Sequence, residues 1–505
     1  MKQLLPLFLM SCALLPGAVN AQTGSLDKTF GKNGIYGADL GGDLRDIAAL
    51  PDGKIIGVGG NPKFTIARFL SNGSIDATFG DTGKTHTLFG AKCGANAVAV
   101  QADGKIVVAG YTSTTTANSG DFDIMAVRYN ADGSLDTTFA TNGIFTSGKS
   151  SNDTASAIDI QPDGKIILAG QVLVGQPALI RLLPDGTPDT TFNKTGYVSV
   201  STPRYGELLA VKVLTDGTIL GAGRYNDTPV IFKFNTDGSL VTTFGNGGMV
   251  TVPNVAGVSL IYNFVVLNNG DFIVAGGNMA TSKYTSFLSK FSGNGTLVTT
   301  FGANGLVVQD GGGNIVTQAK DIAVSGNKII VGYAYGPATN YDFEVSRYDL
   351  DGVPDTDFGT KGNVIFNLGS ATQHDYLNAI AIQPDGKIIA GGYGASGDFS
   401  LARLFATDED TAGTVGFTAS QNKFNVYPNP VAANSKLLID LNTSENLTLK
   451  LYDVKGVLIT TVFEDKAFAS GKTEVDLGLS NLANGIYFLN VMSANKQATT
   501  IKIVK

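Results

Sequence analysis

Tryptophan is absent from this chain of 505 residues, and cysteine and histidine occur only twice each. Nucleophilic catalysis, thiol chemistry and most zinc sites draw on these residue types, so few such sites can be built. Cys93, His86 and His374 stand in no catalytic or metal-ligand motif. The sequence therefore predicts no enzyme and no catalytic residue. A secreted hydrolase or lyase that uses carboxylates on one face of the fold stays open as the alternative.

Charged residues make up only 16% of the chain, and the net charge is −7. No block of Lys and Arg is present, which argues against nucleic acid as a partner. After the N-terminal segment no apolar run approaches the ~20 residues of a membrane helix, so no transmembrane segment is predicted. The hydrophobic content of 43% excludes a disordered chain.

Proline is also scarce, with 16 residues, whereas glycine is abundant, with 64. The glycines follow no three-residue period, so a collagen-like structure is excluded. Glycine in this amount is typical of a β-rich protein with many tight turns.

The N-terminus has the pattern of a secretory signal. Met1 and Lys2 precede an apolar stretch at residues 4–16, and a small-x-small site predicts cleavage between Ala21 and Gln22. Cys12 as a lipoprotein acylation site is the alternative. Residues 1–21 are thus expected to be a signal peptide, and the protein to be secreted or held on the outer cell surface by way of the periplasm.

Three markers recur along the chain with a period of about 55 residues. One is a Gly-Ser-Leu-Asp-x-Thr-Phe-Gly unit, one is an Asp-Gly-Lys-Ile hairpin, and one is a strand that ends in a basic and then an apolar residue. Each marker occurs seven times. The phenylalanines of the first unit are Phe30, Phe79, Phe139, Phe192, Phe244, Phe301 and Phe358.

Each period contains four short strands, for example 143–146, 155–160, 165–170 and 178–183. Four strands repeated seven times predict an all-β fold, a seven-bladed β-propeller over residues 22–405. The chain opens with a Phe30-type unit and a strand at 35–40 but has no eighth unit. We therefore expect this first strand to complete the last blade. The repeated Phe is expected to pack in the core, with a ligand-facing role as the alternative.

The repeat unit resembles the delta-60 repeats of secreted bacterial proteins. The resemblance covers residues 24–405, and two copies depart from it, with Val241 and Val298 in place of the motif Asp. It implies a β-propeller and, because the family has no established activity, no reaction.

A linker is predicted at 406–422 and a small Ig-like β-sandwich at 423–505. The second segment resembles the C-terminal sorting domain of type IX secretion substrates in Bacteroidota, which implies the type IX machinery as a partner. An ordinary adhesion module is the alternative reading. The motif residues that carry the resemblance are Tyr427, Pro428, Asn429, Pro430, Gly485, Tyr487 and Lys505.

Alternating strands place the repetitive hairpins on one face of the propeller and the loops of variable length on the other. Variable loops rich in Tyr, Asn and Ser are typical of binding surfaces, so we expect a glycan or protein ligand on that face. A purely structural surface component is a further alternative, with these tyrosines as tolerated loop residues. The predicted binding residues are Tyr111, Tyr225, Tyr284, Tyr335, Tyr341 and Tyr393.

No cofactor or metal is predicted. Oxygen spacing around Asp136 and Asp355 resembles that of hard-cation loops, which keeps calcium as an alternative. The loops lack a bidentate Glu, and Asp-Gly is also an ordinary turn pair.

Overall fold

The computed structural model describes two compact units, one within Val19–Ala412 and one within Gly413–Lys505. The predicted signal peptide with Ala21 and Gln22, the linker except its first residue Ala406, and Pro428, Asn429 and Pro430 lie outside the described residues. The described residues are 23–60, 62–115, 121–148, 152–173, 175–253, 255, 258–278, 284–312, 315–337, 340–368, 374–394, 398–406, 423–427, 435–441, 444–453, 458–478, 482, 485–493 and 498–505.

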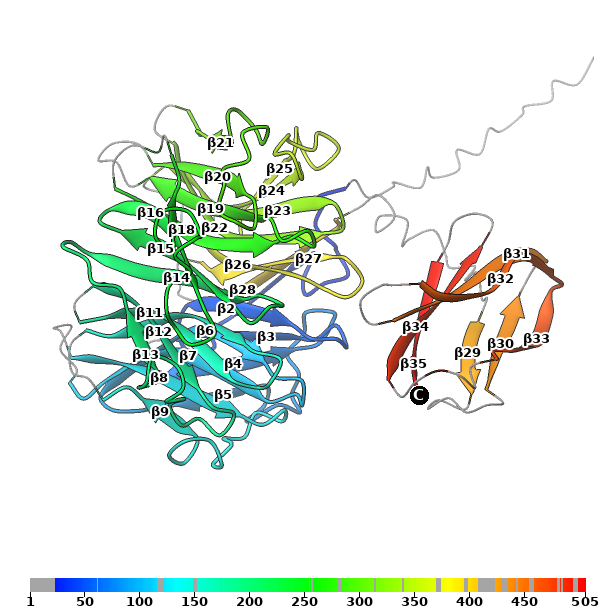
Figure 1. Cartoon of the computed structure of the whole chain (residues 1–505), viewed down its shortest axis with the longest axis horizontal. Helices are drawn as coiled ribbons and strands as arrows, with labels where there is room; N and C mark the ends of the chain where they lie inside the picture. The colour runs from blue at the N-terminus through cyan, green and yellow to red at the C-terminus, as the bar shows by residue number, and fades with distance from the viewer. Residues whose placement is uncertain are drawn as a thin grey trace, which may run out of the picture. The chain divides into compact units, whose positions relative to one another are not determined.

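The first unit contains seven four-stranded antiparallel sheets, which we number as blades (Figure 1). Blade 1 is β2 (Leu44–Ala49), β3 (Ile55–Gly59), β4 (Phe64–Phe69) and β5 (Lys84–Thr87). Blade 2 is β6 (Lys92–Val100), β7 (Ile106–Ser113), β8 (Phe122–Tyr129) and β9 (Ile144–Thr146). Blade 3 is β10 (Thr154–Ile160), β11 (Ile166–Val172), β12 (Gln176–Leu182) and β13 (Tyr197–Ser199). Blade 4 is β14 (Gly206–Val213), β15 (Ile219–Tyr225), β16 (Thr228–Phe234) and β17 (Met249–Thr251).

The remaining blades complete the ring. Blade 5 is β18 (Ser259–Val266), β19 (Phe272–Asn278), β20 (Thr285–Phe291) and β21 (Leu306–Gln309). Blade 6 is β22 (Ile315–Ser325), β23 (Lys328–Pro337), β24 (Asp342–Asp349) and β25 (Asn363–Phe366). Blade 7 is β26 (Tyr376–Ile382), β27 (Ile388–Tyr393), β28 (Phe399–Leu404) and β1 (Ile35–Ala38). The first strand of each blade contacts that of the next, and β26 contacts β2, so the predicted seven-bladed β-propeller is confirmed.

The repeated phenylalanine explains a glycine in the same motif. All seven of these side chains are at most 2% exposed, which confirms the core reading. The ring of Phe30 lies over Gly73 of the next repeat, where an added Cβ would meet ring carbons at 2.7 Å. Gly73 also has φ +83°, a conformation that favours glycine. Each repeat thus packs its Phe on the turn of its neighbour, and blades adhere through a buried contact.

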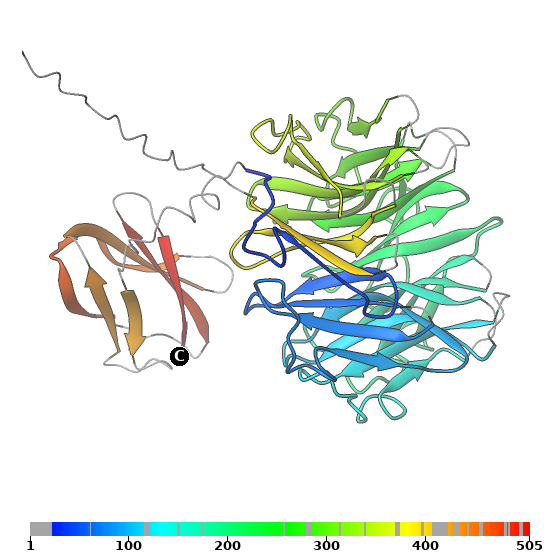
Figure 2. The same ribbon diagram turned by 180° about the vertical axis from the view of Figure 1, so that it is seen from behind.

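The first strand completes the last blade, as expected. β1 pairs with β28 in the register Ile35↔Ala402 to Ala38↔Phe399, and Leu26 bridges Leu404. Figure 2 shows this blue N-terminal segment beside the yellow strands of blade 7. The ring is closed by strand pairing between the two ends of the propeller.

The described residues of the second unit form a β-sandwich of seven strands. One sheet has the strand order β29 (Lys423–Tyr427), β30 (Lys436–Leu441), β33 (Gly471–Asp476). The other has the order β32 (Leu458–Phe468), β31 (Glu445–Asp453), β34 (Ile486–Ser493), β35 (Ala498–Val504). Aliphatic side chains such as Leu437, Leu449 and Leu489 fill the space between the sheets. The predicted motif residues Gly485 and Lys505 bond to each other through both backbone amides, at 3.2 and 2.8 Å.

Candidate functional site

Each innermost strand of the propeller carries one β-bulge. In β2 the pairing with β3 skips Arg45, and the other six blades skip one residue at the equivalent position. A bulge frees one residue from the ladder and re-aims its side chain. The seven skipped residues, which we call the bulge ring, are Arg45, Asn96, Ser156, Leu209, Tyr262, Lys320 and Asn378.

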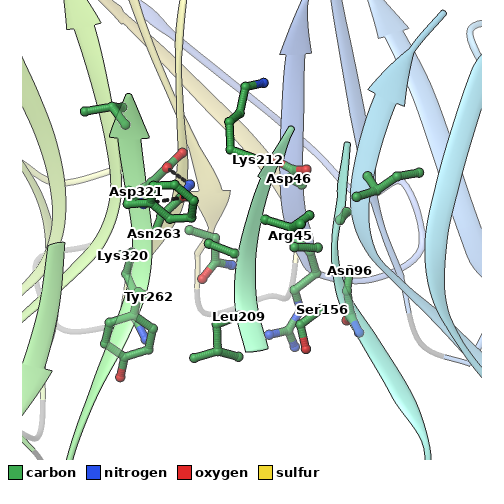
Figure 3. A pocket seen from close by; sticks show the side chains of 18 of the residues that line it. Arg45, Asp46, Asn96, Ser156, Leu209, Lys212, Tyr262, Asn263, Lys320 and Asp321 are labelled. Atoms are coloured by element: carbon green, nitrogen blue, oxygen red, sulfur yellow. Dashed lines mark hydrogen bonds between the residues drawn. The ribbon is translucent and has the colours of Figure 1, made fainter. Parts of the chain in front are cut away.

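All seven bulge-ring residues line one central cavity of about 510 Å³. In Figure 3, Arg45, Ser156, Leu209 and Tyr262 lie at one end of this cavity, and Lys212 lies at the other. Each innermost strand runs from the variable loops toward its hairpin, so the bulge ring surrounds the variable-loop mouth. Lys212 lies late in β14, next to the hairpin face, and pairs with Asp159 at 3.2 Å.

Two aspartates that directly follow bulge-ring residues form a second layer, which joins neighbouring blades. Asp46 accepts hydrogen bonds from its neighbour Ile47 and from the Val98 amide of blade 2, each at 2.8 Å. Asp321 likewise accepts from the Ile380 amide of blade 7 at 2.6 Å. Burial raises the pKa of Asp46 to about 7 and that of Asp321 to about 6, although the amide hydrogen bonds oppose the shift. These carboxyl groups thus connect neighbouring blades by hydrogen bonds.

Three of the predicted tyrosines meet in one aromatic cluster at this face. The ring of Tyr376, which the sequence analysis did not select, stacks on Tyr393 at 5.2 Å and lies 4.9 Å from Tyr341. His374 contacts both Tyr376 and Tyr341, at 5.6 and 5.3 Å. Tyr284 packs against the same group. Tyr341 is only 7% exposed, so it supports the cluster, whereas Tyr393 is half-buried.

The other three predicted tyrosines lie within their own blades. Tyr111 packs edge-on against Phe122, with ring centroids 4.9 Å apart. The hydroxyl of Tyr225 donates to the Ser201 carbonyl at 3.1 Å. Tyr335 is half-buried on β23. No ring contact in the described part of the chain joins these three to the cluster, and the six-residue binding face stays a prediction.

The sequence analysis missed the bulge ring because its members differ in type. Their position does repeat: Arg45 lies ten residues before Ile55, and Asn96 lies ten residues before Ile106. Aligning the repeats on the hairpin marker would have found most of this column, but not Lys320, which lies only nine residues before Ile329.

The repeated Asp belongs to a buried ion-pair cluster. In blade 2, Asp136 Oδ2 lies 2.7 Å from Arg128 Nε and 3.0 Å from Lys105 Nζ, and Oδ1 accepts from Thr138. The Arg128 guanidinium lies over the Phe139 ring at 4.6 Å and donates to the Pro184 carbonyl of the next blade. A calcium ion would have to displace these partners. No group of three or more His, Cys, Asp or Glu suited to a metal occurs among the residues that the structure describes.

Five repeats carry this Asp–Arg cluster, and two replace it. The two repeats with Val241 and Val298 in place of the Asp also have a lysine, Lys233 or Lys290, in place of the arginine. The hairpin lysine of these two blades is also absent, with Thr218 and Asp271 in its place. Three positions thus change together, as expected for groups in one ion pair. The five clusters contain Arg68–Asp76, Arg128–Asp136, Arg181–Asp189, Arg347–Asp355 and Arg403–Asp27.

Comparison with protein families identifies the second unit. Residues 425–505 match the model described as "Secretion system C-terminal sorting domain". This unit is a type IX sorting domain. The sorting domain directs the protein through type IX secretion to the cell surface or the extracellular space, and makes the secretion machinery its partner. No helix in the described part of the chain is long and apolar enough to cross a membrane.

The propeller matches a second family, described as "Domain of unknown function (DUF5122) beta-propeller", at residues 50–79, 101–139, 161–192, 327–358 and 383–408. These segments contain the arginines of the five Asp–Arg clusters, and the two repeats with Val are not matched. The propeller expected from the delta-60 resemblance is confirmed.

Solved structures resemble the chain in fold alone. A protein of unknown function from Bacteroides caccae is 13% identical and covers 54% of this chain and 89% of its own, with a TM-score of 0.34. Drosophila Semaphorin 1b is 8% identical over 76% and 88%, with a TM-score of 0.43. The polysaccharide lyase Uly1 is 12% identical over 79% and 94%, with a TM-score of 0.41. The sequence matches no curated protein.

Two sets of aspartates, those in the Asp–Arg clusters and the cavity residues Asp46 and Asp321, have pKa values shifted in opposite directions. Together they predict that the free energy of unfolding is largest near pH 4 to 5. Although burial opposes it, hydrogen bonds from Thr and the paired Arg hold the pKa of Asp76 and Asp189 at about 2. Their stabilisation, on the order of 2 kcal/mol each, is present above the unfolded pKa of ~4 and lost as pH falls toward 2. Asp46 and Asp321, with raised pKa, bind protons in the folded state and lose stability as pH rises from ~4 to about 7 and 6.

Urea denaturation from pH 2 to 8 measures this dependence. Asp46→Asn is expected to flatten the slope above pH 4 only, and Asp76→Asn the slope below pH 4 only. A stability that rises steadily from pH 4 to 7 in the unmodified protein contradicts the assignment of the raised pKa values.

Proposed function

We propose that the propeller is a non-catalytic binding module, presented outside the cell, whose ligand sits at the variable-loop mouth of the central cavity. The observation that carries this proposal is the contrast within the bulge ring. The backbone position is the same in all seven blades, yet it holds Arg, Asn, Ser, Leu, Tyr, Lys and Asn. The preceding position holds only Leu, Ala or Ile. A regular scaffold with one varied, cavity-facing position is typical of recognition by repeat proteins.

Binding is favoured over carboxylate catalysis by the state of the cavity acids. Asp46 and Asp321 accept backbone amides of neighbouring blades, so their oxygens already have partners. His374 is stacked between tyrosines, and its Nδ1 lies 3.3 Å from the Tyr341 amide. The geometry supports a ligand that is held by side chains of the mouth, either a glycan or a protein segment.

A thermal-shift screen of the mature chain against glycan and peptide arrays tests the proposal. A ligand present at 100 times its Kd stabilises the folded state by roughly 2.7 kcal/mol, which raises the Tm. Tyr262→Ala is expected to weaken binding by at least about tenfold, because it removes an aromatic contact at the cavity mouth. Tyr197→Ala, on the outermost strand of blade 3, is the matched control. Absence of any stabilising ligand, or equal binding by both variants, overturns the proposal.

A further inference from the structure

The bulge ring carries two cations and no acid. Lys320 belongs to blade 6 and Arg45 to blade 1, and Asn378 of blade 7 lies between them in the ring. The remaining members are two polar residues, one tyrosine and one leucine. This arc of the mouth is therefore positive.

Neither cation is neutralised within the ring. No carboxylate forms an ion pair with Lys320 in the described part of the chain, and its ammonium lies 4.3 Å from the centre of the Tyr262 ring. Arg45 pairs with Asp43 at 2.9 Å, but both groups are at least 32% exposed, so this pair contributes little to the stability of the fold. The Arg45 guanidinium also lies 5.7 Å from the Tyr393 ring. Burial, together with the Arg45 charge, lowers the pKa of Lys320 to about 8. The two positive charges thus repel each other across a partly desolvated mouth.

In the described part of the chain neither cavity acid forms an ion pair with Arg45 or Lys320. Asp46 and Asp321 lie in the second layer, where backbone amides of the next blades hold them. Asn263 also donates to Asp321 at 2.5 Å. An anion at the mouth would bring a negative charge to Lys320 and could share the Arg45 guanidinium with the exposed Asp43 carboxylate.

The neighbouring groups suit a hydroxyl-rich ligand. The amide nitrogen of Asn378 donates to the Leu44 carbonyl at 2.7 Å, and that of Asn96 donates to the Ala155 carbonyl at 2.8 Å. No donor to either amide oxygen occurs among the residues that the structure describes, so each oxygen can accept from a ligand hydroxyl. Tyr262 and Tyr393 are half-buried and offer aromatic surface beside the two cations. A long apolar side chain, by contrast, would meet only Leu209 in the ring.

We propose that the mouth binds an anionic saccharide, with its acid group between Arg45 and Lys320 and its sugar rings against Tyr262 and Tyr393. This inference rests on the proposed binding function and names the ligand class for the same site. Carboxylate and sulfate share the required charge, and either is compatible with the two cations.

Isothermal titration calorimetry on the mature chain separates the possibilities. The probes are trigalacturonate, sulfated maltotriose, neutral maltotriose and a triglutamate peptide. At least one acidic saccharide is expected to bind at least about tenfold more tightly than maltotriose and triglutamate. Arg45→Gln and Lys320→Gln are each expected to weaken that binding by about tenfold or more. Lys212→Gln, at the opposite end of the cavity, is expected to leave it within about twofold.

The outcomes distinguish this inference from the function on which it rests. Preference for trigalacturonate or for sulfated maltotriose, lost in both cation variants, supports the inference and identifies the acid group. Maltotriose binding that falls in Tyr262→Ala but not in the cation variants overturns the anionic ligand and leaves the binding function in place. Preference for triglutamate overturns the saccharide. Absence of binding by all four probes overturns the inference, whereas the array screen decides the function independently.

Discussion

Deletion of residues 22–40 is expected to lower the Tm of the propeller by at least about 10 °C. The segment supplies β1 and the fully buried Phe30. Removal of a buried Phe side chain costs about 3–5 kcal/mol. The segment also carries Asp27, whose carboxylate lies 2.8 Å from Arg403, and loss of one partner of a buried pair costs a similar amount. Together these losses approach the whole stability of a typical domain. Thermal denaturation followed by circular dichroism measures the change.

A matched control moves the segment instead of removing it. Insertion of residues 23–40 directly after Ala406, in a chain that otherwise starts at Gly41, places Gly24 five residues after Arg403. The same spacing separates Arg68 from Gly73 in the continuous repeat of blade 1. This permuted chain is expected to recover most of the lost Tm, because the segment enters blade 7 as in the other repeats. An unchanged Tm after simple deletion would show that β1 does not close the ring.

The sequence predicts the ring because its markers are local. Phe139, the Asp163–Gly164 turn and the Arg181 strand each repeat within a short window, and their number and spacing define seven blades. β1 spans Ile35–Ala38, close to the expected 35–40. The reason for the markers is not local: Arg128 joins its own Asp136 to the Pro184 carbonyl of the next blade, a contact across 56 positions.

The candidate site is less predictable for a physical reason. A bulge adds one residue and shifts the alternation of buried and exposed positions by one. In strands as short as β2 and β22 the sequence does not reveal this shift, so Arg45 and Lys320 resemble ordinary exposed strand residues. Tyrosine, by contrast, is conspicuous in loops, and this guided the choice of six residues. Only Tyr284, Tyr341 and Tyr393 lie in the aromatic cluster, because side-chain direction depends on backbone geometry that composition does not encode.

Loss of the aspartate of one Asp–Arg cluster is expected to destabilise the propeller strongly. The residues at the same positions in blade 4 indicate which further substitutions should restore stability. Asp136→Val is expected to lower the free energy of unfolding by about 3–5 kcal/mol, because Arg128 is only 7% exposed and loses its carboxylate. Blade 4 tolerates Val241 with Lys233 and Thr218 at the three corresponding positions. The Lys233 ammonium lies 5.9 Å from the Phe244 ring, so the aromatic contact persists without the ion pair. Urea denaturation at neutral pH measures the loss.

The triple variant Asp136→Val, Arg128→Lys, Lys105→Thr is therefore expected to be more stable than Asp136→Val alone, although it carries two further changes. Arg128→Lys with Lys105→Thr, which leaves Asp136 with one lysine in place of its two cationic partners, is the matched control and is expected to be destabilised. If the three changes added independently, the triple variant would be the least stable of the set, and the joint replacement in blades 4 and 5 would then have no energetic basis in the ion pair. Recovery of stability in the triple variant would instead show that two combinations of residues can fill the same buried positions of a blade, one with an Asp–Arg ion pair and one with an apolar Val in place of the Asp.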